Sequence, residues 1–457
     1  MDAPDQAPAG SGKRSTAMAA FAAVTVLFFA WGFITSLIDP LVAAVKGIFT
    51  LSDAEAQLSA SAFFIAYGLM SFPAAALIAR FHSVPSILTA LSTMVVGCLV
   101  MLAAANLAAY PLVLAGLFIL ASGITILQVA ANPLAAALGD PKQSHFRLTL
   151  SQTFNSFGTF LGPLIGAHLF LQGVEVKEGM VVTEAVRAQA LAGIDAAYFW
   201  ICGLIVALLI FFWVSRRIVN EAVPPAPIGA RAGMGELVRE AAASRWAMLG
   251  GLAIFLYVGA EVAIGTHMAF FLNGDSVWGQ SDAPFGVPLL GWFMGSDGVR
   301  GVSLQEAGKA VAFYWLGAMV GRAVGSGLLT VVKAHKLLAL FTAIAAAMCL
   351  YVFAVGGVTA GFVALSIGLF NSIMFPVIFT LTLERSTASA ESTSGLLCTA
   401  IVGGAILPLL VGLVSGSHGY SFALIVPAIC YVALCFFAIA AGRAPTVRAE
   451  GEVSSIH

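Results

Sequence analysis

Apolar segments long enough to cross a lipid bilayer follow one another along almost the whole chain. A membrane-spanning helix needs about 20 mostly apolar residues. The pattern predicts twelve such spans, at 18–45, 57–80, 84–106, 110–138, 147–172, 196–215, 247–272, 305–331, 335–355, 358–384, 394–415 and 419–441. We therefore expect an all-α integral membrane protein with twelve transmembrane helices.

Polar stretches separate these spans into two sets of six. A polar tail at 1–17 precedes the first span, and another at 442–457 follows the last. The linker at 216–246 is rich in proline, glycine and arginine. We expect it to join two six-helix bundles, at 18–215 and 247–441, that move relative to each other.

The two halves carry a faint internal repeat. Gln128 stands five residues before Pro133 in the fourth span, and Asn371 stands five residues before Pro376 in the tenth. Repeated halves with interrupted helices are typical of secondary transporters, whose substrate lies between the repeats near the middle of the membrane. Coincidence is the alternative, because proline and glycine are common in membrane helices.

Composition and charge agree with a membrane protein and predict its orientation. Only 9% of the residues are charged and the mean hydropathy is +0.98, whereas soluble domains carry about 25% charged residues. With the N-terminus inside, fifteen Lys and Arg residues lie in inner segments and five in outer segments. The positive-inside rule therefore predicts that both termini are cytoplasmic, in a multi-pass protein of a bacterial inner membrane.

Motifs for catalysis and for cofactor binding are missing from the sequence. The six cysteines stand singly, without a CxxC pair or a Cys/His cluster, so we expect neither a metal site nor a disulfide framework. The chain has no phosphate-binding loop, nucleophile elbow or dinucleotide fingerprint. We therefore expect no enzymatic activity, no cofactor and no nucleic-acid partner.

Two carboxylates in apolar surroundings are candidates for ion coupling. Charged side chains at the bilayer centre cost about 2.5–3.5 kcal/mol on insertion scales, so they persist mainly where they have a function. Asp39 lies near the outer end of the first span, after Thr35 and Ser36 and before Pro40; Glu261 lies deep in the seventh span among small residues. The alternatives are a helix-end aspartate in water and a structural hydrogen-bond acceptor.

Uncharged amides predict a site for a ligand rich in hydroxyl groups. Gln128 and Asn132 are four residues apart, and Gln152 and Asn155 are three apart, so each pair shares a helical face. Asn371 adds a third helix. Amides donate and accept hydrogen bonds without charge, as binding of a neutral sugar requires. Each single amide has the alternative role of joining two helices.

Three aromatic residues and one charged pair complete the candidate set. Trp31, Phe154 and Phe375 can stack on the apolar face of a sugar ring. Arg322, in the eighth span, is a candidate gate residue that pairs with a helix end or with a carboxylate such as Glu384. The alternative for Arg322 is an arginine that extends to the inner membrane surface.

Five segments of the chain together resemble a known family. LFFAWGFITSLIDPL, LQVAANPLAAALG, HFRLTLSQTFNSFG, YVGAEVAIG and FNSIMFPVIF occur in this order between about residues 25 and 440. They resemble the fucose permease-type branch of the major facilitator superfamily. The resemblance implies a cation-coupled sugar symporter with two six-helix bundles, and Asp39 matches the aspartate of the family's first span.

The chain departs from the fucose permease pattern at two positions. Gln128 stands where that branch has an acidic residue, and Glu261 stands where it has a glutamine. The combination of LQVAANP with YVGAE is more similar to the glucose/galactose and N-acetylglucosamine porters of the same family. The resemblance therefore implies one of these sugars rather than fucose.

Together these features predict inward symport of a neutral hexose with a proton, by a protein that functions as a monomer. Sodium as the coupling ion and fucose as the substrate are the alternatives within this class. A drug-efflux antiporter shares the twelve-span body, but its site is normally apolar and rich in carboxylates. A membrane sensor is a further alternative, and the lack of a sizeable aqueous domain argues against it.

Overall fold

The computed structural model describes residues 11–37, 41, 49, 53–171, 184–223, 233–296 and 298–447. These residues form helices joined by turns and loops, and ten stretches among them are long and apolar enough to cross a membrane. Two further predicted spans coincide with the long helices α6 (Ser144–Leu171) and α11 (Leu304–Leu328), which are not among the ten. The all-helical membrane architecture is confirmed, and the total of twelve spans stays a prediction.

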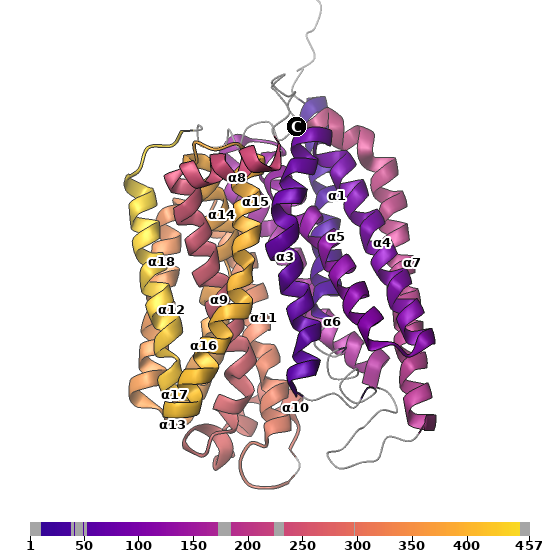
Figure 1. The fold of residues 1–457 in the computed structure, drawn as a ribbon. Coiled ribbons are helices and arrows are strands. Elements are labelled where there is room, and N and C mark those ends of the chain that lie inside the picture. Colours follow the sequence, from indigo (N-terminus) through magenta and orange to yellow (C-terminus); the bar gives the residue numbers. More distant parts are fainter. Residues whose placement is uncertain are drawn as a thin grey trace, which may run out of the picture.

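The helices form two groups that follow the two halves of the sequence (Figure 1). The first half contributes α1 (Ser11–Ser36), α3 (Asp53–Phe81), α4 (Ser83–Leu107), α5 (Tyr110–Ala137), η1 (Pro141–Gln143), α6 and α7 (Glu184–Ala222). The second contributes α8 (Met234–Ala243), α9 (Arg245–Asn273), η2 (Asp275–Gly279), η3 (Ala283–Gly286), α10 (Pro288–Met294), α11, α12 (Ala334–Val355), α13 (Gly357–Asn371), α14 (Met374–Arg385), α15 (Ala390–Thr399), η4 (Ala400–Val402), α16 (Gly403–His418), α17 (Tyr420–Ala423) and α18 (Ile425–Arg443).

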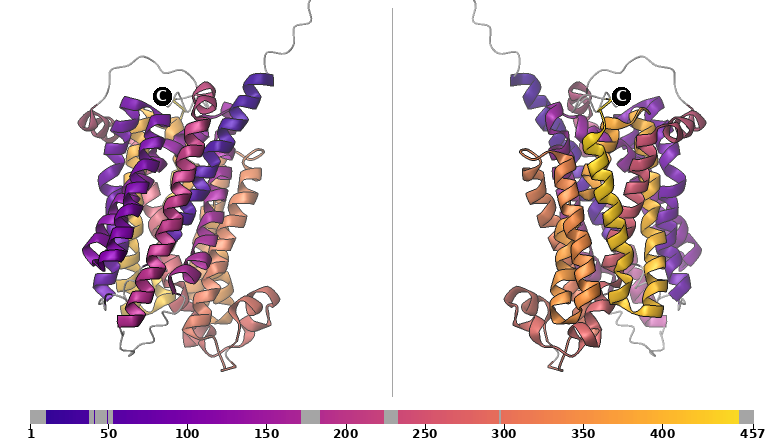
Figure 2. Two further views of the ribbon diagram at one scale, coloured as in Figure 1. Left: turned by 90° about the vertical axis from the view of Figure 1, so that its right-hand side faces the viewer. Right: turned by 90° about the vertical axis from the view of Figure 1, so that its left-hand side faces the viewer.

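The two halves lie side by side, and most long helices run between the same two ends of the molecule (Figure 2). We call the end that carries α8 and the C-terminal end of α18 the linker end (Figure 1). α8 packs against α3 of the first half and α15 of the second half. The linker helix therefore contacts both halves at one end of the molecule.

One predicted span, 358–384, is interrupted in the middle of the molecule. α13 ends at Asn371 and α14 begins at Met374. Pro376 has no amide N–H, so it cannot donate to the carbonyl oxygen of Ser372, four residues earlier. That free carbonyl instead accepts a hydrogen bond from Arg322 Nε, at 2.7 Å. The proline thus creates a polar backbone site inside the bundle.

At the linker end of the molecule, two buried arginines donate hydrogen bonds to carbonyl oxygens at helix C-termini. Arg147 donates to the carbonyl oxygens of Ala135, at 3.3 Å, and of Ala136, both in the last turn of α5. Arg385 donates to the carbonyl oxygen of Ala441 in α18, at 2.8 Å. The last carbonyls of a helix lack partners and carry partial negative charge, so a cation stabilises them. Each arginine therefore joins two helices of one half.

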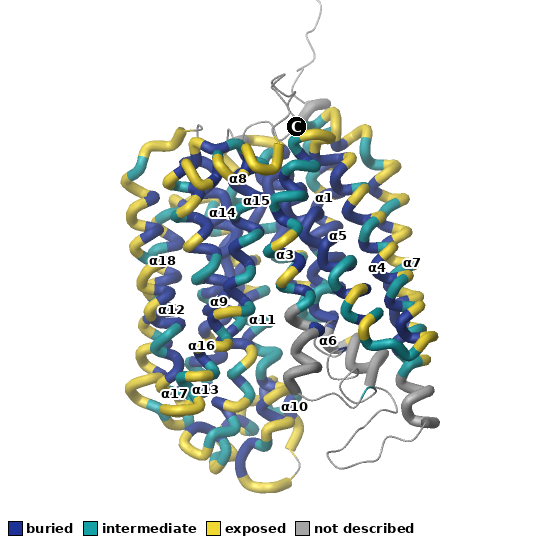
Figure 3. Tube along the Cα trace, in the orientation of Figure 1, coloured by how far each residue is buried: buried dark blue, intermediate teal, exposed yellow. Residues whose placement is uncertain are grey.

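Close backbone contact joins α1 to α6. A Cβ atom added at Gly158 would lie 2.3 Å from the carbonyl oxygen of Phe29, and one added at Gly32 would lie 2.2 Å from that of Asn155. Only glycine permits this approach, which brings the polar face of α6 close to α1. Buried residues lie inside the bundles, whereas exposed positions, many of them apolar, cover the outer surface (Figure 3). This distribution suits a lipid environment.

Candidate functional site

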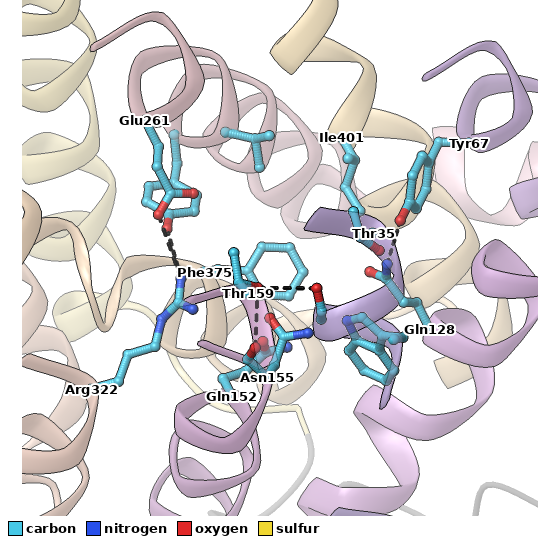
Figure 4. Close-up of a pocket in the computed structure, with 14 residues that line it drawn as sticks. Thr35, Tyr67, Gln128, Gln152, Asn155, Thr159, Glu261, Arg322, Phe375 and Ile401 are labelled. Carbon is cyan, nitrogen blue, oxygen red and sulfur yellow. Dashed lines mark hydrogen bonds and ion pairs between the residues drawn. The ribbon is translucent and has the colours of Figure 1, made fainter. Parts of the chain in front are cut away.

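A cavity of about 190 Å³ lies between the two halves. Its first-half wall is formed by Trp31, Gly32, Thr35, Tyr67, Gln128, Gln152, Asn155 and Thr159. Its second-half wall is formed by Tyr257, Val258, Glu261, Arg322, Phe375 and Ile401. Figure 4 shows the amides on one side of this space and the Glu261–Arg322 pair on the other. The cavity therefore has an uncharged polar wall opposite a charged wall.

The amides of the first-half wall are held by hydrogen bonds to neighbouring helices. Gln128 Nε2 donates to the hydroxyl of Tyr67 at 2.5 Å, which joins α5 to α3. Asn155 Nδ2 donates to the carbonyl oxygen of Phe28 at 3.1 Å, which joins α6 to α1. Fixed rotamers reduce the entropy lost when a ligand binds. The amide side chains of this wall are therefore held in place before a ligand binds.

Arg322 is the central group of the second-half wall and is only 9% exposed. Its Nη2 lies 3.5 Å from Glu261 Oε1 and 3.4 Å from the hydroxyl of Tyr257. Its Nη1 donates to Ser156 Oγ on α6, which belongs to the other half. A buried cation requires such partners, because losing water without replacement is costly. Arg322 thus joins the carboxylate to the opposite half across the cavity.

Aromatic rings extend both walls. Trp31 lines the first-half wall, and its ring packs against Phe28 with the centroids 4.2 Å apart. Phe375 lines the second-half wall, and its ring lies 6.4 Å from that of Tyr257. Phe154, whose side chain is 45% exposed, is not among the residues that line the cavity. The structure therefore brings Trp31 and Phe375 to the site and excludes Phe154 from it.

Two of the five predicted amides lie behind the cavity instead of lining it. Asn132 is fully buried, and its Oδ1 accepts from Gln152 Nε2 at 3.0 Å. Asn371 is also fully buried and donates to the hydroxyl of Tyr314 at 2.5 Å. Neither side chain therefore lines the cavity in this structure, and direct contact of Asn132 or Asn371 with a ligand stays a prediction. Helical spacing predicts the face on which a side chain lies, but it does not predict how deep the side chain is buried.

Glu384 contacts a histidine of the other half. His145 Nε2, at the start of α6, lies 2.9 Å from Glu384 Oε1, and His145 Nδ1 lies 2.5 Å from Thr380 Oγ1. Arg385 Nη1 lies 2.9 Å from Glu384 Oε2. Glu384 and Arg322 are not paired in this structure, and Arg322 instead donates to the carbonyl oxygen of Ser372 at the C-terminal end of α13. The gating role of the two residues stays a prediction. Asp39, the second carboxylate considered for coupling, lies outside the described residues.

Two tyrosines of the cavity were missed by the reasoning from sequence. Tyr257 stands four residues before Glu261 in α9 and therefore lies on the same helical face, which was a usable signal. Tyr67 binds Gln128 although 61 positions separate them. The eight residues around it, FFIAYGLM, contain no other polar side chain. The role of Tyr67 therefore needed the tertiary structure.

Comparisons with known proteins agree with this architecture. The sequence profile of the Major Facilitator Superfamily matches residues 20–401. The chain is 36% identical over 421 residues to a glucose/galactose transporter of Brucella abortus, covering 92% of this chain and 93% of that one. It is 30% identical over 439 residues to the L-fucose-proton symporter of Escherichia coli, covering 94% of each chain.

A solved structure shares the fold as well. The crystal structure of the Major Facilitator Superfamily transporter FucP in the outward conformation superposes with a TM-score of 0.79 and 27% identity, covering 94% of this chain and all of that chain. The profile match and the sequence relatives both extend over most of the protein. The chain therefore belongs to the Major Facilitator Superfamily and is a membrane transporter.

Proposed function

We propose that the protein imports a neutral hexose of the glucose/galactose type together with a proton across a bacterial inner membrane. The observation that carries this proposal is the central cavity, where Gln128, Gln152 and Asn155 face Glu261 and Arg322. Two of the relatives, a glucose/galactose transporter and an L-fucose-proton symporter, support both the sugar and the ion of this proposal. The uptake experiment described below tests which hexose and which ion are transported.

The composition of the cavity favours an uncharged substrate. Arg322 Nη2 lies 3.5 Å from Glu261 Oε1, so the two charges compensate each other. The ion pair therefore adds no net charge to the cavity walls. The amides provide neutral hydrogen-bonding groups, and Trp31 and Phe375 provide apolar ring faces. A sugar ring has both kinds of surface. A large apolar cation, the typical cargo of a drug-efflux antiporter, would leave the amides without partners.

Glu261 is the carboxylate that we propose for proton coupling. Its side chain is buried at 9% exposure and reaches both the cavity and Arg322. Protonation of Glu261 removes its charge and so weakens its hold on Arg322, which also bonds to Ser156 of the other half. Loading of the proton and contact between the halves are therefore linked through one arginine. Asp39 remains the second proposed coupling residue.

We further propose twelve spans with both termini and the linker end in the cytoplasm. The excess of Lys and Arg in the predicted inner segments supports this orientation. At the linker end the halves touch, because a Cβ at Gly395 of α15 would lie 2.9 Å from Ala75 of α3. His145 and Glu384 make a polar contact between the halves. In this orientation these contacts between the halves lie on the cytoplasmic side of the molecule.

The test is uptake of labelled hexoses into right-side-out membrane vesicles that contain the protein. We expect uphill accumulation of glucose or galactose that stops when a protonophore collapses the gradient and that does not require sodium. Unlabelled glucose and galactose should compete better than fucose, and N-acetylglucosamine belongs in the same panel. Accumulation that persists with a protonophore and requires a sodium gradient would establish sodium coupling instead. Vesicles without the protein are the control.

A further inference from the structure

An apolar segment lies between the predicted seventh and eighth spans, outside both of them. Residues 283–295 read APFGVPLLGWFMG and contain no charged side chain, whereas GQSD precedes them and SDGVR follows them. This segment is too short to cross a bilayer, which takes about 20 residues. An apolar segment of this length is typically buried in the protein or placed at a membrane interface.

The structure shows that the helix in this segment, α10, is buried on one face only. Leu290 and Met294 are buried, so they form the face that packs on the protein. Leu289 is 60% exposed and Trp292 is 79% exposed. These two residues are three positions apart and therefore share a helical face. Burial in the protein thus accounts for one face of α10 and leaves an apolar face uncovered.

The buried face of α10 is fixed to α11, so the exposed face has a set position. The ring of Phe293 meets that of Phe313 in α11 edge-on, with the centroids 5.6 Å apart. Lys309 Nζ of α11 donates to the carbonyl oxygen of Met294, the last residue of α10, at 2.8 Å. A cation at a helix C-terminus stabilises the free carbonyls there. α10 is therefore held against the first turns of α11.

The position of α10 in the molecule favours lipid as the occupant of its exposed face. The helix lies at the end opposite the linker end (Figure 1), and the segment between η2 and α11 projects sideways there, beyond the neighbouring helices (Figure 2). In a membrane transporter, the space beside the helix ends is the boundary between lipid headgroups and acyl chains. α11 presents exposed apolar side chains along its length, at Leu304, Val320 and Val324. The uncovered face of α10 thus continues the lipid-facing surface of the bundle.

We propose that α10 is an interfacial anchor, which inserts Leu289 and Trp292 into the lipid leaflet at the end opposite the linker end. Tryptophan combines a large apolar ring with one N–H donor, and this combination suits the boundary between acyl chains and headgroups. The lack of charge in 283–295 removes the main cost of insertion. Through Lys309 and Phe313, the anchor ties the first turns of α11 to the membrane surface.

The test measures the depth of α10 in the bilayer with a nitroxide spin label on Leu289→Cys, in the full-length protein in nanodiscs of phosphatidylethanolamine and phosphatidylglycerol. Collision rates are recorded with oxygen, which concentrates among the acyl chains, and with a water-soluble nickel chelate. Labels on Ser296→Cys, in the exposed loop, and on Val324→Cys, on the lipid-facing surface, are the references for water and for lipid. The parent protein, whose native cysteines are buried or partly buried, gives the background of labelling.

We expect the nickel rate at position 289 to be several-fold below that at 296, and the ratio of oxygen to nickel rates to lie between the two references. Rates equal to those at 296 would place α10 in water, as a site for a soluble partner requires. Rates equal to those at 324 would place it among the acyl chains. Low rates with both reagents would mean that protein, such as a second copy of the chain, covers the face. Each of these three results would overturn the anchor.

Trp292→Glu tests whether the tryptophan holds α10 at this depth. A carboxylate is costly in the bilayer, so the nickel rate at 289 should rise several-fold in this variant. Trp292→Phe keeps an apolar ring and should keep the low rate. Gln305→Glu, which adds the same charge at an exposed position of α11, is the matched control. Unchanged rates at 324 show that the Trp292→Glu protein is folded.

An unchanged nickel rate at 289 in a folded Trp292→Glu protein would refute the role of Trp292. None of these measurements involves a transported solute. The inference therefore goes beyond the proposed function, and it stands or fails separately from hexose uptake.

Discussion

At the scale of single residues, the site consists of polar side chains whose orientation is set by partners on other helices. Asn155 depends on Phe28 of α1, and Gln128 depends on Tyr67 of α3. A hydrogen bond between neutral groups contributes about 0.5–1.5 kcal/mol. Substitutions that remove one such group should therefore alter affinity measurably without preventing insertion of the protein.

Asn155→Ala should raise the half-saturating sugar concentration about two- to twelvefold, because it removes one acceptor from the cavity. Gln152→Ala should act in the same direction, since Gln152 also lines the cavity. The measurement is the concentration dependence of uptake, normalised to protein abundance in the membrane. Asn106→Ala is the control, because Asn106 is an exposed asparagine that bonds Asp195 outside the cavity. Unchanged affinity in both cavity variants would place the sugar elsewhere.

Glu261→Gln should abolish gradient-driven accumulation while sugar exchange across the membrane continues. Glutamine keeps an oxygen that can accept from Arg322, but it cannot take up and release a proton. Asp39→Asn should behave in the same way if it captures the ion on entry. The measurements are uphill uptake and counterflow in the same vesicles, with Asp195→Asn, a carboxylate outside the cavity, as the control. Accumulation equal to that of the parent in both variants would mean that neither carboxylate couples.

At the scale of helices, the linker end is closed by contacts between the halves. α3 packs against α15, and α6 meets α14 through His145 and Glu384. Glu384, which the sequence suggested as a gate residue, thus contacts His145 of the other half and not Arg322. Helix ends that meet across two bundles can separate without disturbing either bundle, as alternating access requires.

Glu384→Gln should weaken the closed state of the linker end, because it removes the charge that faces His145. A cysteine introduced as Ser71→Cys reports opening, since Ser71 is fully buried where α3 meets α15. We expect alkylation of that cysteine from the linker side to become several-fold faster in the Glu384→Gln protein. Native Cys98, buried inside the first half, should stay unreactive. Equal alkylation rates with and without the substitution would exclude a gating role for Glu384.

At the scale of the whole molecule, the distribution of Lys and Arg predicts the orientation in the membrane. The division into two halves predicts how the cavity is exposed to each side in turn. The proposed arrangement places the linker and both termini in the cytoplasm, and the loop between η2 and α11 outside. A movement of one half against the other then exposes the same cavity first to one side and then to the other.

Reporter fusions should confirm this orientation. A fluorescent protein fused after His457 should fluoresce, and alkaline phosphatase at the same place should be inactive, because the C-terminus is expected inside. Phosphatase inserted after Ser296, which lies in the loop before α11, should be active. The two insertion sites serve as controls for each other. An active phosphatase at the C-terminus would reverse the proposed topology and place the linker end outside.

The sequence by itself determined the helical membrane architecture, predicted a sugar as the substrate, and identified most of the polar residues that line the cavity. Long apolar runs must become helices, since a bilayer offers the backbone no other hydrogen-bonding partners. Polar side chains in such runs are conspicuous because they are costly there. Gln128, Gln152, Asn155, Glu261 and Arg322 were therefore identified before the fold was known, and all of them line the cavity.

Only the tertiary structure decided which partner each of these side chains has. Arg322 contacts residues 50, 61 and 166 positions away, in Ser372, Glu261 and Ser156. Helical periodicity places a residue on a face, but it does not say which helix lies opposite or how deep the side chain sits. For that reason the sequence did not show that Asn132 and Asn371 lie behind the cavity wall, or that Glu384 contacts His145. Contacts between distant segments depend on packing, which local spacing does not encode.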